Sequence, residues 1–346
     1  MRFFSPKMIT ESSLYWIIGI IIGIGVILGV APRRLGAQEN LIDSINASIN
    51  SSSQVKFSKK LVCVKIIRSY NGLNLRQPSR VFCDTLRKEI YILDAGRHRI
   101  LVYSQDFYPL LSISKLDGLS CPLGLTMDKK GYLFVLQGRD SRVPKPRISV
   151  FDPILRWKKA IYFTGFDGSK KFYPKHIAIG EKGNFYVAGS GIYGVLVLHR
   201  DGSFSHFLSP IDRLAEGEEH KVSICDVTVD QQGRIYLLSE NMGRIYVYDK
   251  NEKFLFKFGQ KGGGTGKLSR PRGLAVDDKN KIIYVVDYMR HVVNLYSLDG
   301  HFLLEFGGFG WEKGWFQYPS DVAVDANGDV LVADTFNNRV QVFRLQ

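Results

Sequence analysis

The stretch YPSDVAVDANGDVLVADTFNNRVQVF, from Tyr318 to Phe343, is the clearest copy of a pattern that fills most of the chain. It contains an alternating apolar run, the polar turn DANGD, a β-branched run, a second polar stretch and a third apolar run. This order is typical of three short antiparallel strands. The stretch RPRGLAVDDKNKIIYVVDYMRHVVNLY, from Arg270 to Tyr296, has the same layout. The chain therefore contains an internal repeat whose unit is made of β-strands.

Four further stretches follow the same plan, which makes six copies. They are QPSRVFCDTLRKEIYILDAGRHRILVY from Gln77, CPLGLTMDKKGYLFVLQ from Cys121, YPKHIAIGEKGNFYVAG from Tyr173 and SICDVTVDQQGRIYLLSENMGRIYVY from Ser223. We expect a fourth strand between copies, after a D-G or N-E turn, as in SLDGHFLLEFG and DKNEKFLFKFG. Four antiparallel strands every 44 to 52 residues is the period of a propeller blade. The sequence thus predicts an all-β fold, a six-bladed β-propeller with four-stranded antiparallel blades.

The two ends of the repeat region predict how the ring closes. The last copy stops at Gln346, directly after its third strand, and KKLVCVKIIRSYNG, from Lys59 to Gly72, supplies an unassigned strand at the other end. Pairing the first and last segments leaves no open sheet edge. We therefore expect that removing residues 57–70 unfolds the ring instead of trimming a tail.

The motifs P-x-[DG]-[VL]-A-V-D, G-x-[IV]-[YL]-V-[VA]-D and N-N-R-V-Q-V-F resemble those of the NHL repeat, and the resemblance covers essentially everything after residue 57. Three copies depart from it. The copy from Ser223 lacks the first proline, the third copy has Gly189 for the aspartate and Gly194 for the arginine, and the second contains the insertion GRDSRVPKP.

The region before the repeats predicts a membrane anchor. Residues 14–31 read LYWIIGIIIGIGVILGVA, eighteen residues without a charge, which is long enough to cross a bilayer as a helix. A cleaved signal peptide is the alternative, but Pro32 follows the one small-x-small site. We expect a flank at 1–13, a transmembrane helix acting as a signal-anchor at 14–31, a polar linker at 32–56 and the propeller at 57–346. Basic residues on both sides of the helix divide the orientation signal, and we favour an extracytoplasmic propeller.

The net charge and the cysteines limit the kinds of partner and of metal site that the chain is expected to have. Lys and Arg outnumber Asp and Glu by 47 to 33, a net charge of +14, which suits contact with phosphate-rich, polysaccharide or anionic-lipid surfaces. We expect a protein or polysaccharide partner before a nucleic acid. The four cysteines include no C-x-x-C pair, which argues against a zinc knuckle. If the propeller is exported, Cys63 and Cys83 are candidates for a disulfide, because both belong to strands near the ring closure.

The third position of each P-x-[DG] motif is expected at the mouth of the central channel. Around the ring these positions hold Arg80, Gly124, His176, Asp226, Gly273 and Asp321. His176, Asp226 and Asp321 are candidate ligands for a divalent cation, Ca²⁺ or Zn²⁺, as the resemblance to NHL-like lyases and lactonases implies. The alternative is that Asp or Gly at this position supports the backbone.

The loop between the second and third strands should lie on the same face. There Asp94, Asp287 and Asp334 are expected to accept backbone hydrogen bonds, and the arginines that recur at one register are interpreted as architectural. These arginines are Arg99, Arg147, Arg244 and Arg339. Residues that could contact a ligand or partner on this face are Arg80, His98, His291, Trp311 and Trp315. The two histidines could instead be turn formers, and the tryptophans could pack over a blade.

No complete catalytic motif appears in the sequence, because G-x-S-x-G and H-E-x-x-H are both absent. We therefore expect a non-catalytic, membrane-tethered binding or scaffold propeller for a protein or an anionic polymer. The alternatives are a metal-dependent lyase or lactonase that uses the channel mouth, and an RNA-binding propeller of the kind that the resemblance implies.

Overall fold

The computed structural model describes residues 59–141, 143–213 and 219–346. The predicted anchor at 14–31 and linker at 32–56 lie outside these residues and stay predictions. Within the described ranges, no helix has both the length and the apolar character needed to cross a bilayer.

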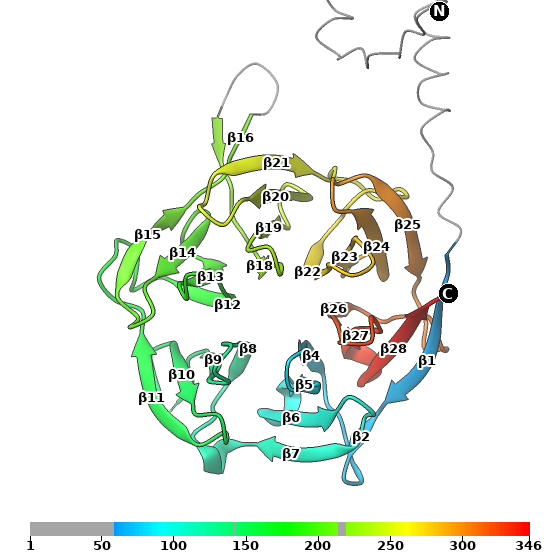
Figure 1. Cartoon of the computed structure of the whole chain (residues 1–346), viewed down its shortest axis with the longest axis horizontal. Helices are drawn as coiled ribbons and strands as arrows, with labels where there is room; N and C mark the ends of the chain where they lie inside the picture. Colours follow the sequence, from blue (N-terminus) through cyan, green and yellow to red (C-terminus); the bar gives the residue numbers. More distant parts are fainter. Residues whose placement is uncertain (1–58, 142, 214–218) are drawn as a thin grey trace, which may run out of the picture. The chain divides into compact units, whose positions relative to one another are not determined.

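Six four-stranded antiparallel sheets surround a central channel, as the repeat predicts (Figure 1). Blade 1 contains β4 (Pro78–Asp84), β5 (Glu89–Asp94), β6 (Arg99–Ser104) and β7 (Pro109–Ile113). Blade 2 contains β8 (Pro122–Met127), β9 (Leu133–Gln137), β10 (Arg147–Phe151) and β11 (Trp157–Tyr162). Blade 3 contains β12 (Tyr173–Ile179), β13 (Phe185–Ser190), β14 (Val195–Leu198) and β15 (Phe204–Leu208).

The second half of the ring repeats this order. Blade 4 contains β18 (Asp226–Val229), β19 (Ile235–Ser239), β20 (Arg244–Tyr248) and β21 (Phe254–Phe258). Blade 5 contains β22 (Pro271–Asp277), β23 (Ile282–Asp287), β24 (Val292–Ser297) and β25 (Phe302–Gly307). Blade 6 contains β26 (Pro319–Val324), β27 (Val330–Asp334), β28 (Arg339–Leu345) and, as its outer strand, β1 (Leu61–Ile67).

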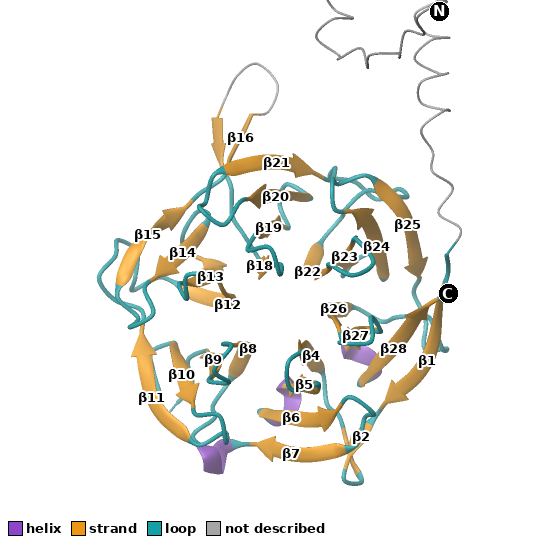
Figure 2. Ribbon diagram, viewed as in Figure 1, coloured by secondary structure: helices purple, strands orange, loops and turns teal. Residues whose placement is uncertain are grey.

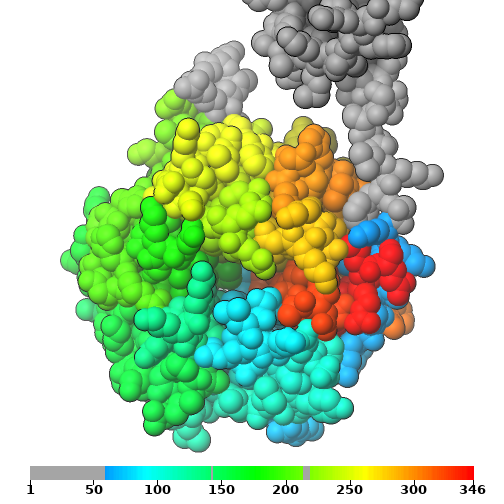
Figure 3. Space-filling model, viewed as in Figure 1, coloured from blue at the N-terminus to red at the C-terminus, as the bar shows by residue number. Residues whose placement is uncertain are grey.

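The closure of the ring is the predicted one. The strand β1 pairs antiparallel with β28, from Leu61 opposite Leu345 to Ile67 opposite Val340. Backbone hydrogen bonds of 2.9 Å in both directions between Lys60 and Gln346 extend this pairing by one residue. In Figure 3 the blue start of the described chain lies directly beside its red end. One blade therefore contains both ends of the repeat region.

Proline explains how the innermost strands begin. In five blades the register between the first and second strands shifts just after the proline, as between Pro78 and Arg80 or between Pro319 and Asp321. Proline has no N–H to donate to a sheet ladder, so a bulge at the strand end accommodates it. Blade 4 lacks this proline, and there β18 begins at Asp226.

The core lies between the blades. The second and third strands are buried along almost their whole length, as in β23 and β24, and the outer strands expose one face. Because the β-branched and aromatic residues of neighbouring sheets pack together, no single blade buries its own apolar faces.

Smaller elements lie outside the blades. The hairpin β2 (Ser69–Tyr70) with β3 (Leu73–Asn74) leads from β1 to blade 1, and β16 (Ile211–Arg213) pairs with β17 (Glu219–Lys221) between blades 3 and 4. The 3₁₀ turns η2 (Ala95–Arg97), η3 (Lys115–Asp117) and η5 (Thr335–Asn337) are the purple segments in Figure 2.

The suggested disulfide is wrong. Cys63 lies in the outermost strand of blade 6, whereas Cys83 lies in the innermost strand of blade 1, where it lines the central channel. All four cysteines are free thiols. The two strands are neighbours along the chain, but the width of a blade separates them.

Candidate binding face

Two kinds of loop meet on one face of the ring. In blades 1, 5 and 6 the loop between the second and third strands contacts the segment that leads into the first strand of the same blade. The N–H of Gly96 donates to the carbonyl of Arg76 at 2.8 Å, and the N–H of Phe336 donates to the carbonyl of Gln317 at 3.1 Å. This confirms the expectation that both segments share a face, which we call the loop face.

Buried aspartates at the end of the second strand fix these contacts. Asp94 accepts a 2.6 Å hydrogen bond from the N–H of Arg76, and Asp334 accepts one of 2.7 Å from the N–H of Gln317. Asp287 accepts from the N–H groups of Ser269 and Arg270. The predicted structural role of these three aspartates is confirmed.

The recurring arginines complete this arrangement in two blades. Arg99 donates to Asp94 at 2.8 Å and Arg339 donates to Asp334 at 2.6 Å. Arg147 donates to Gln137, which stands where blades 1, 5 and 6 have aspartate, while Arg244 pairs instead with Asp212 of β16. The architectural interpretation of this register is confirmed in all four blades.

At the centre of the loop face, four of the predicted mouth residues form one ion-paired cluster. Arg80 of blade 1 donates to Asp321 of blade 6 at 3.0 Å and lies 3.7 Å from Asp226 of blade 4, on the opposite side of the ring. The Nδ1 atom of His176 contacts the Asp226 carboxylate and lies 3.1 Å from the carbonyl oxygen of Val227. We call these four residues the mouth cluster.

The two aspartates of the mouth cluster also link neighbouring blades through the backbone. Asp226 accepts a 3.0 Å hydrogen bond from the N–H of Leu274 in blade 5, and Asp321 accepts one of 3.0 Å from Val81 in blade 1. A side chain at Gly273 would place its Cβ 2.7 Å from the Cα of Asp321, so only glycine fits there. Asp226, Asp321 and Gly273 therefore support the backbone, as the alternative interpretation proposed.

The electrostatics of the mouth cluster follow from burial. Burial raises the pKa of Asp321, Arg80 lowers it and the nearby Asp226 raises it further. For Arg80, burial acts to lower the pKa, but the carboxylates of Asp321 and Asp226 outweigh burial and raise it. The guanidinium is the cation that compensates these two buried carboxylates.

The predicted metal site gains no support from this geometry. His176, Asp226 and Asp321 do lie together, but Arg80 contacts both carboxylates that were expected to bind the ion. Among the described residues, no group of three or more His, Cys, Asp or Glu side chains is arranged to hold a metal. A Ca²⁺ or Zn²⁺ site therefore stays a prediction.

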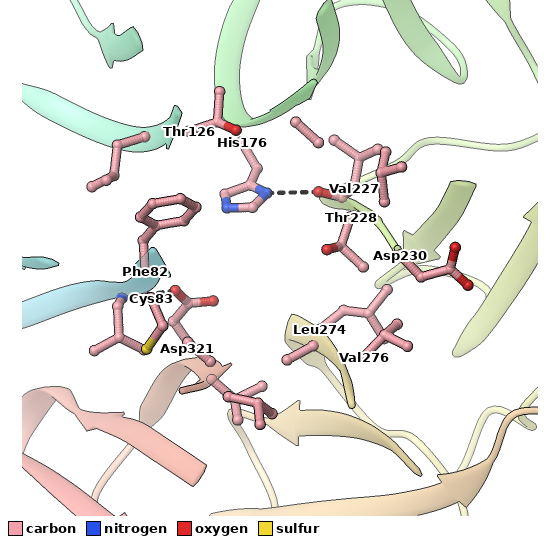
Figure 4. Close-up of a pocket in the computed structure, with 18 of the residues that line it drawn as sticks. Phe82, Cys83, Thr126, His176, Val227, Thr228, Asp230, Leu274, Val276 and Asp321 are labelled. Atoms are coloured by element: carbon pink, nitrogen blue, oxygen red, sulfur yellow. Dashed lines mark hydrogen bonds between the residues drawn. The ribbon is translucent and has the colours of Figure 1, made fainter. Parts of the chain in front are cut away.

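Cavities lie on both sides of the mouth cluster. A channel cavity of about 300 Å³ contains Cys83, Thr126, His176 and Thr228 among its lining residues. Figure 4 shows these side chains around one space, with a dashed line from His176 to the carbonyl of Val227. Towards the loop face, Arg80 also lines a second cavity of about 430 Å³, which we call the basin.

The basin combines aromatic, cationic and acidic groups. Its lining includes Tyr173, Lys175, Glu240 and Arg272. Glu240 is engaged by Arg270, whose Nε lies 2.7 Å away. The guanidinium of Arg272 lies 3.6 Å from the centroid of the Tyr288 ring, a close cation–π contact. The basin thus has a positively charged wall that continues into an aromatic surface.

That aromatic surface covers the loop face over blades 5 and 6. Ring centroids are 4.9 Å apart for Tyr288 and Tyr318, 4.6 Å for His291 and Tyr318, 5.0 Å for His291 and Phe309, and 5.1 Å for Tyr318 and Phe336. We call these five residues the aromatic shelf, together with Trp311 and Trp315, which belong to the same loop as Phe309. Its most exposed side chains are Trp311 at 71%, Phe309 at 57%, Trp315 at 49% and Phe336 at 47%.

The loop that holds Trp311 and Trp315 is braced from below. Arg339, which is 1% exposed, donates to the carbonyls of Glu312 and Trp315 at 2.9 Å each. The side chain of Gln341 also donates to Trp315 at 2.7 Å and accepts from the N–H of Gly314. The Trp315 ring lies over Gly308 of its own loop, where any larger residue would collide with it. The shelf is therefore held in place by buried polar side chains.

The predicted histidines have different surroundings. His98 of blade 1 and His291 of blade 5 both adopt the left-handed conformation, at φ 51° and 59°, as Asn338 does at the same register in blade 6. This supports the interpretation of both as turn formers. His291 in addition belongs to the shelf, and burial lowers its pKa although Asp287 and Asp334 act to raise it. Among the described residues, neither His98 nor His291 contacts His176.

The sequence predictions omitted four shelf residues: Tyr288, Phe309, Tyr318 and Phe336. The signal for Phe309 and Tyr318 was available, because the loop FGGFGWEKGWFQYP has a counterpart of equal length, FGQKGGGTGKLSRP, between blades 4 and 5. After the phenylalanine that opens both stretches, only the loop at 306–319 contains aromatic residues. Tyr288 and Phe336 come from other loops, and their approach to Tyr318 depends on the ring geometry.

Comparisons with known proteins agree with this fold. A family model described as a 6-bladed beta-propeller, DUF5128, matches residues 217–307, and the NHL repeat model matches residues 316–343. A search of curated proteins finds no match.

Solved structures with the same fold are distant in sequence. A structural genomics protein of unknown function from Bacteroides thetaiotaomicron has a TM-score of 0.59 and 12% identity, over 84% of this chain and 76% of that one. An auxiliary nutrient binding protein from Bacteroides ovatus has a TM-score of 0.62 and 12% identity, over 84% and 77%. A streptogramin B lyase has a TM-score of 0.50 and 9% identity, over 85% and 100%. With six four-stranded blades and these matches, the chain is a six-bladed β-propeller, and residues 316–343 of its last blade match the NHL repeat.

Proposed function

We propose that this propeller is a non-catalytic binding module whose loop face engages a protein or an anionic polymer. The observation that carries the proposal is the aromatic shelf: four large, exposed aromatic side chains on loops that are braced by buried Arg339 and Gln341. Exposed aromatic groups held rigidly lose little conformational entropy on binding and are enriched in interfaces. The similar fold of an auxiliary nutrient binding protein is compatible with this proposal.

The mouth cluster also favours binding over catalysis. Arg80, His176, Asp226 and Asp321 are engaged with one another and with the backbone of neighbouring blades. A general base or metal ligand has to be available to substrate, and these groups already hold the ring together. Metal analysis of the purified full-length chain separates the two functions, because stoichiometric, tightly held metal would favour the lyase alternative.

We further propose that residues 14–31 tether the propeller to a membrane and that the propeller is extracytoplasmic. The support is the uncharged eighteen-residue segment in the sequence. Protease treatment of intact membranes tests the orientation. Digestion of the propeller without lysis is the expected result, whereas digestion only after lysis would place the domain in the cytoplasm.

Binding by the loop face is tested with the full-length chain in extracts and membranes of the cells that produce it. The variant W311G/W315K removes two exposed rings. Y108K removes a ring that is 70% exposed on the outer part of blade 1 and serves as the matched control. We expect the first variant to lose its bound material and the control to keep it. Equal retention by both variants would overturn binding by this face.

A further inference from the structure

The two long connecting loops of the propeller provide an internal comparison. FGQKGGGTGKLSRP, residues 258–271, and FGGFGWEKGWFQYP, residues 306–319, have the same length and the same parallel bridge, Lys261 with Leu268 and Phe309 with Phe316. Leu268 and Phe316 are both fully buried. The two loops therefore have the same backbone bridge, and each has one buried apolar side chain at the same position.

The exposed positions of these loops differ completely. Phe309, Trp311, Trp315 and Tyr318 stand where the other loop has Lys261, Gly263, Lys267 and Arg270. The loop at 258–271 forms the same bridge without these rings, so folding does not require aromatic residues at these four positions. Large exposed apolar groups that the fold does not need are typical of an interaction site.

The rings of the aromatic shelf do not form a flat platform. His291 and Phe309 are inclined by 62°, Tyr318 and Phe336 by 61°, and Tyr288 and Tyr318 by 38°. Rings inclined in this way present their edges and faces at different angles, and we expect apolar notches between them that suit inserted side chains. A sugar chain instead stacks best on rings that lie parallel to its own faces, so the tilt favours a polypeptide.

The basin adds positive charge next to these notches. Within the described part of the chain, Lys175 and Arg272 have no carboxylate partner among the recorded ion pairs, although both line the basin. Arg272 stacks on Tyr288, and Tyr288 contacts Tyr318, so the basin and the shelf form one continuous surface. A carboxylate placed in the basin would have two cations to pair with.

We infer that this combined surface binds a segment of a partner protein in which a carboxylate is flanked by apolar side chains. The carboxylate lies in the basin between Lys175 and Arg272, and the apolar side chains fill the notches of the shelf. This inference rests on the proposed function, since it names the class of partner for the same face.

The test uses a displayed library of random twelve-residue peptides, selected on the full-length chain. Selected peptides are measured by fluorescence anisotropy against the wild type and three variants. F309K/W311G/W315K installs the residues of the loop 258–271, K175Q/R272Q removes the charges of Lys175 and Arg272, and Y108K is the control. Thermal unfolding checks that each variant folds, and we expect all of them to, because the changes are on the surface. A short oligogalacturonate serves as the polysaccharide probe.

We expect the selected peptides to combine Asp or Glu with Leu, Phe or Trp. Their affinity should fall at least about tenfold for each of the two site variants and stay unchanged for Y108K. Selected peptides without carboxylates, or unaffected by K175Q/R272Q, would overturn the inference. Shelf-dependent binding of oligogalacturonate alone would overturn the protein partner and keep the proposed function. If no probe depends on the shelf, the inference and binding by this face both fail.

Discussion

A buried aspartate at the end of the second strand shows how much one side chain contributes to this propeller. Asp334 is fully buried and contacts the N–H of Gln317, the guanidinium of Arg339 and the side chain of Asn337. It therefore connects two loops of one blade and orients the arginine that braces the aromatic shelf. Stability and the binding surface depend on the same residue.

The variant Asp334→Ala should be strongly destabilised. It leaves Arg339 buried without its carboxylate, and removing one partner of a buried ion pair costs about 3–5 kcal/mol. We expect this loss in the free energy of unfolding from denaturant titration. Asp299→Ala is the control, since Asp299 is exposed and interacts only with exposed groups, the ring of His301 and the hydroxyl of Ser297, and it should change stability by less than about 0.5 kcal/mol. Similar losses in both variants would contradict the assigned role.

At the scale of elements, the carboxylate of Asp212 joins the hairpin β16–β17 to blade 4. Asp212 of β16 accepts hydrogen bonds from Arg244 at 2.6 Å, from Tyr246 at 2.7 Å and from Lys257. Burial alone would raise the pKa of Asp212, but these three donors outweigh it and lower the pKa to about 2.

This attachment should give the protein an acid-dependent stability. A carboxylate whose pKa is lowered on folding stabilises the native state above its unfolded pKa, and the effect disappears as the pH falls through the folded pKa. For Asp212 the window runs from 3.8 down to about 2. We expect the Tm of the wild type to fall more steeply in this window than that of Asp212→Asn, as measured by circular dichroism. Parallel curves would show that the attachment does not contribute.

At the scale of the whole molecule, the mouth cluster links opposite sides of the ring. Arg80 compensates Asp321 and Asp226, which come from different blades. In Arg80→Gln the two buried carboxylates lose this guanidinium, and His176, which contacts Asp226, is the one basic side chain left in the mouth cluster. Burial and the charge of Asp226 already raise the pKa of Asp321, and loss of Arg80 raises it further.

The stability of Arg80→Gln should decrease as the pH rises. A carboxyl group with a raised folded pKa binds its proton more tightly in the native state, so stability falls as the pH rises through that pKa. The Tm of Arg80→Gln, relative to wild type, should decrease as the pH rises above the ordinary pKa of an aspartate, 3.8. The double variant Arg80→Gln/Asp321→Asn should lose this decrease. A difference in Tm that does not vary with pH would refute the electrostatic role.

Ring closure gives a second prediction at this scale. Deleting residues 57–70 removes β1 and leaves β28 without its outer neighbour. We expect the Tm to fall by about 10 °C or more, or the single cooperative transition to be lost. The control deletes fourteen residues of the predicted linker, 41–54. A deletion of β1 that melts like this control would contradict closure by the first strand.

The fold could be predicted from the sequence because the repeat is local: strands, turns and the number of blades follow from the six copies of one pattern of apolar runs and polar turns. The mouth residues were also placed correctly, since their register repeats. The sequence does not show which side chains of different blades contact one another across the ring. That Arg80 spans from blade 1 to Asp226, and that Tyr288 meets Tyr318, depends on side chains from blades that the repeat treats as independent. The Cys63–Cys83 expectation failed because closeness along the chain was taken for closeness in space.

The use of β1 as the last strand of blade 6 also affects how the protein is made. When β1 leaves the ribosome its partner β28 has not been synthesised, and at about 5–20 residues per second the delay is on the order of 15 to 60 s. During that time LVCVKII is an apolar strand with two unpaired edges, interrupted only by Lys65. Nascent chains should therefore depend on a chaperone that covers this segment until translation ends.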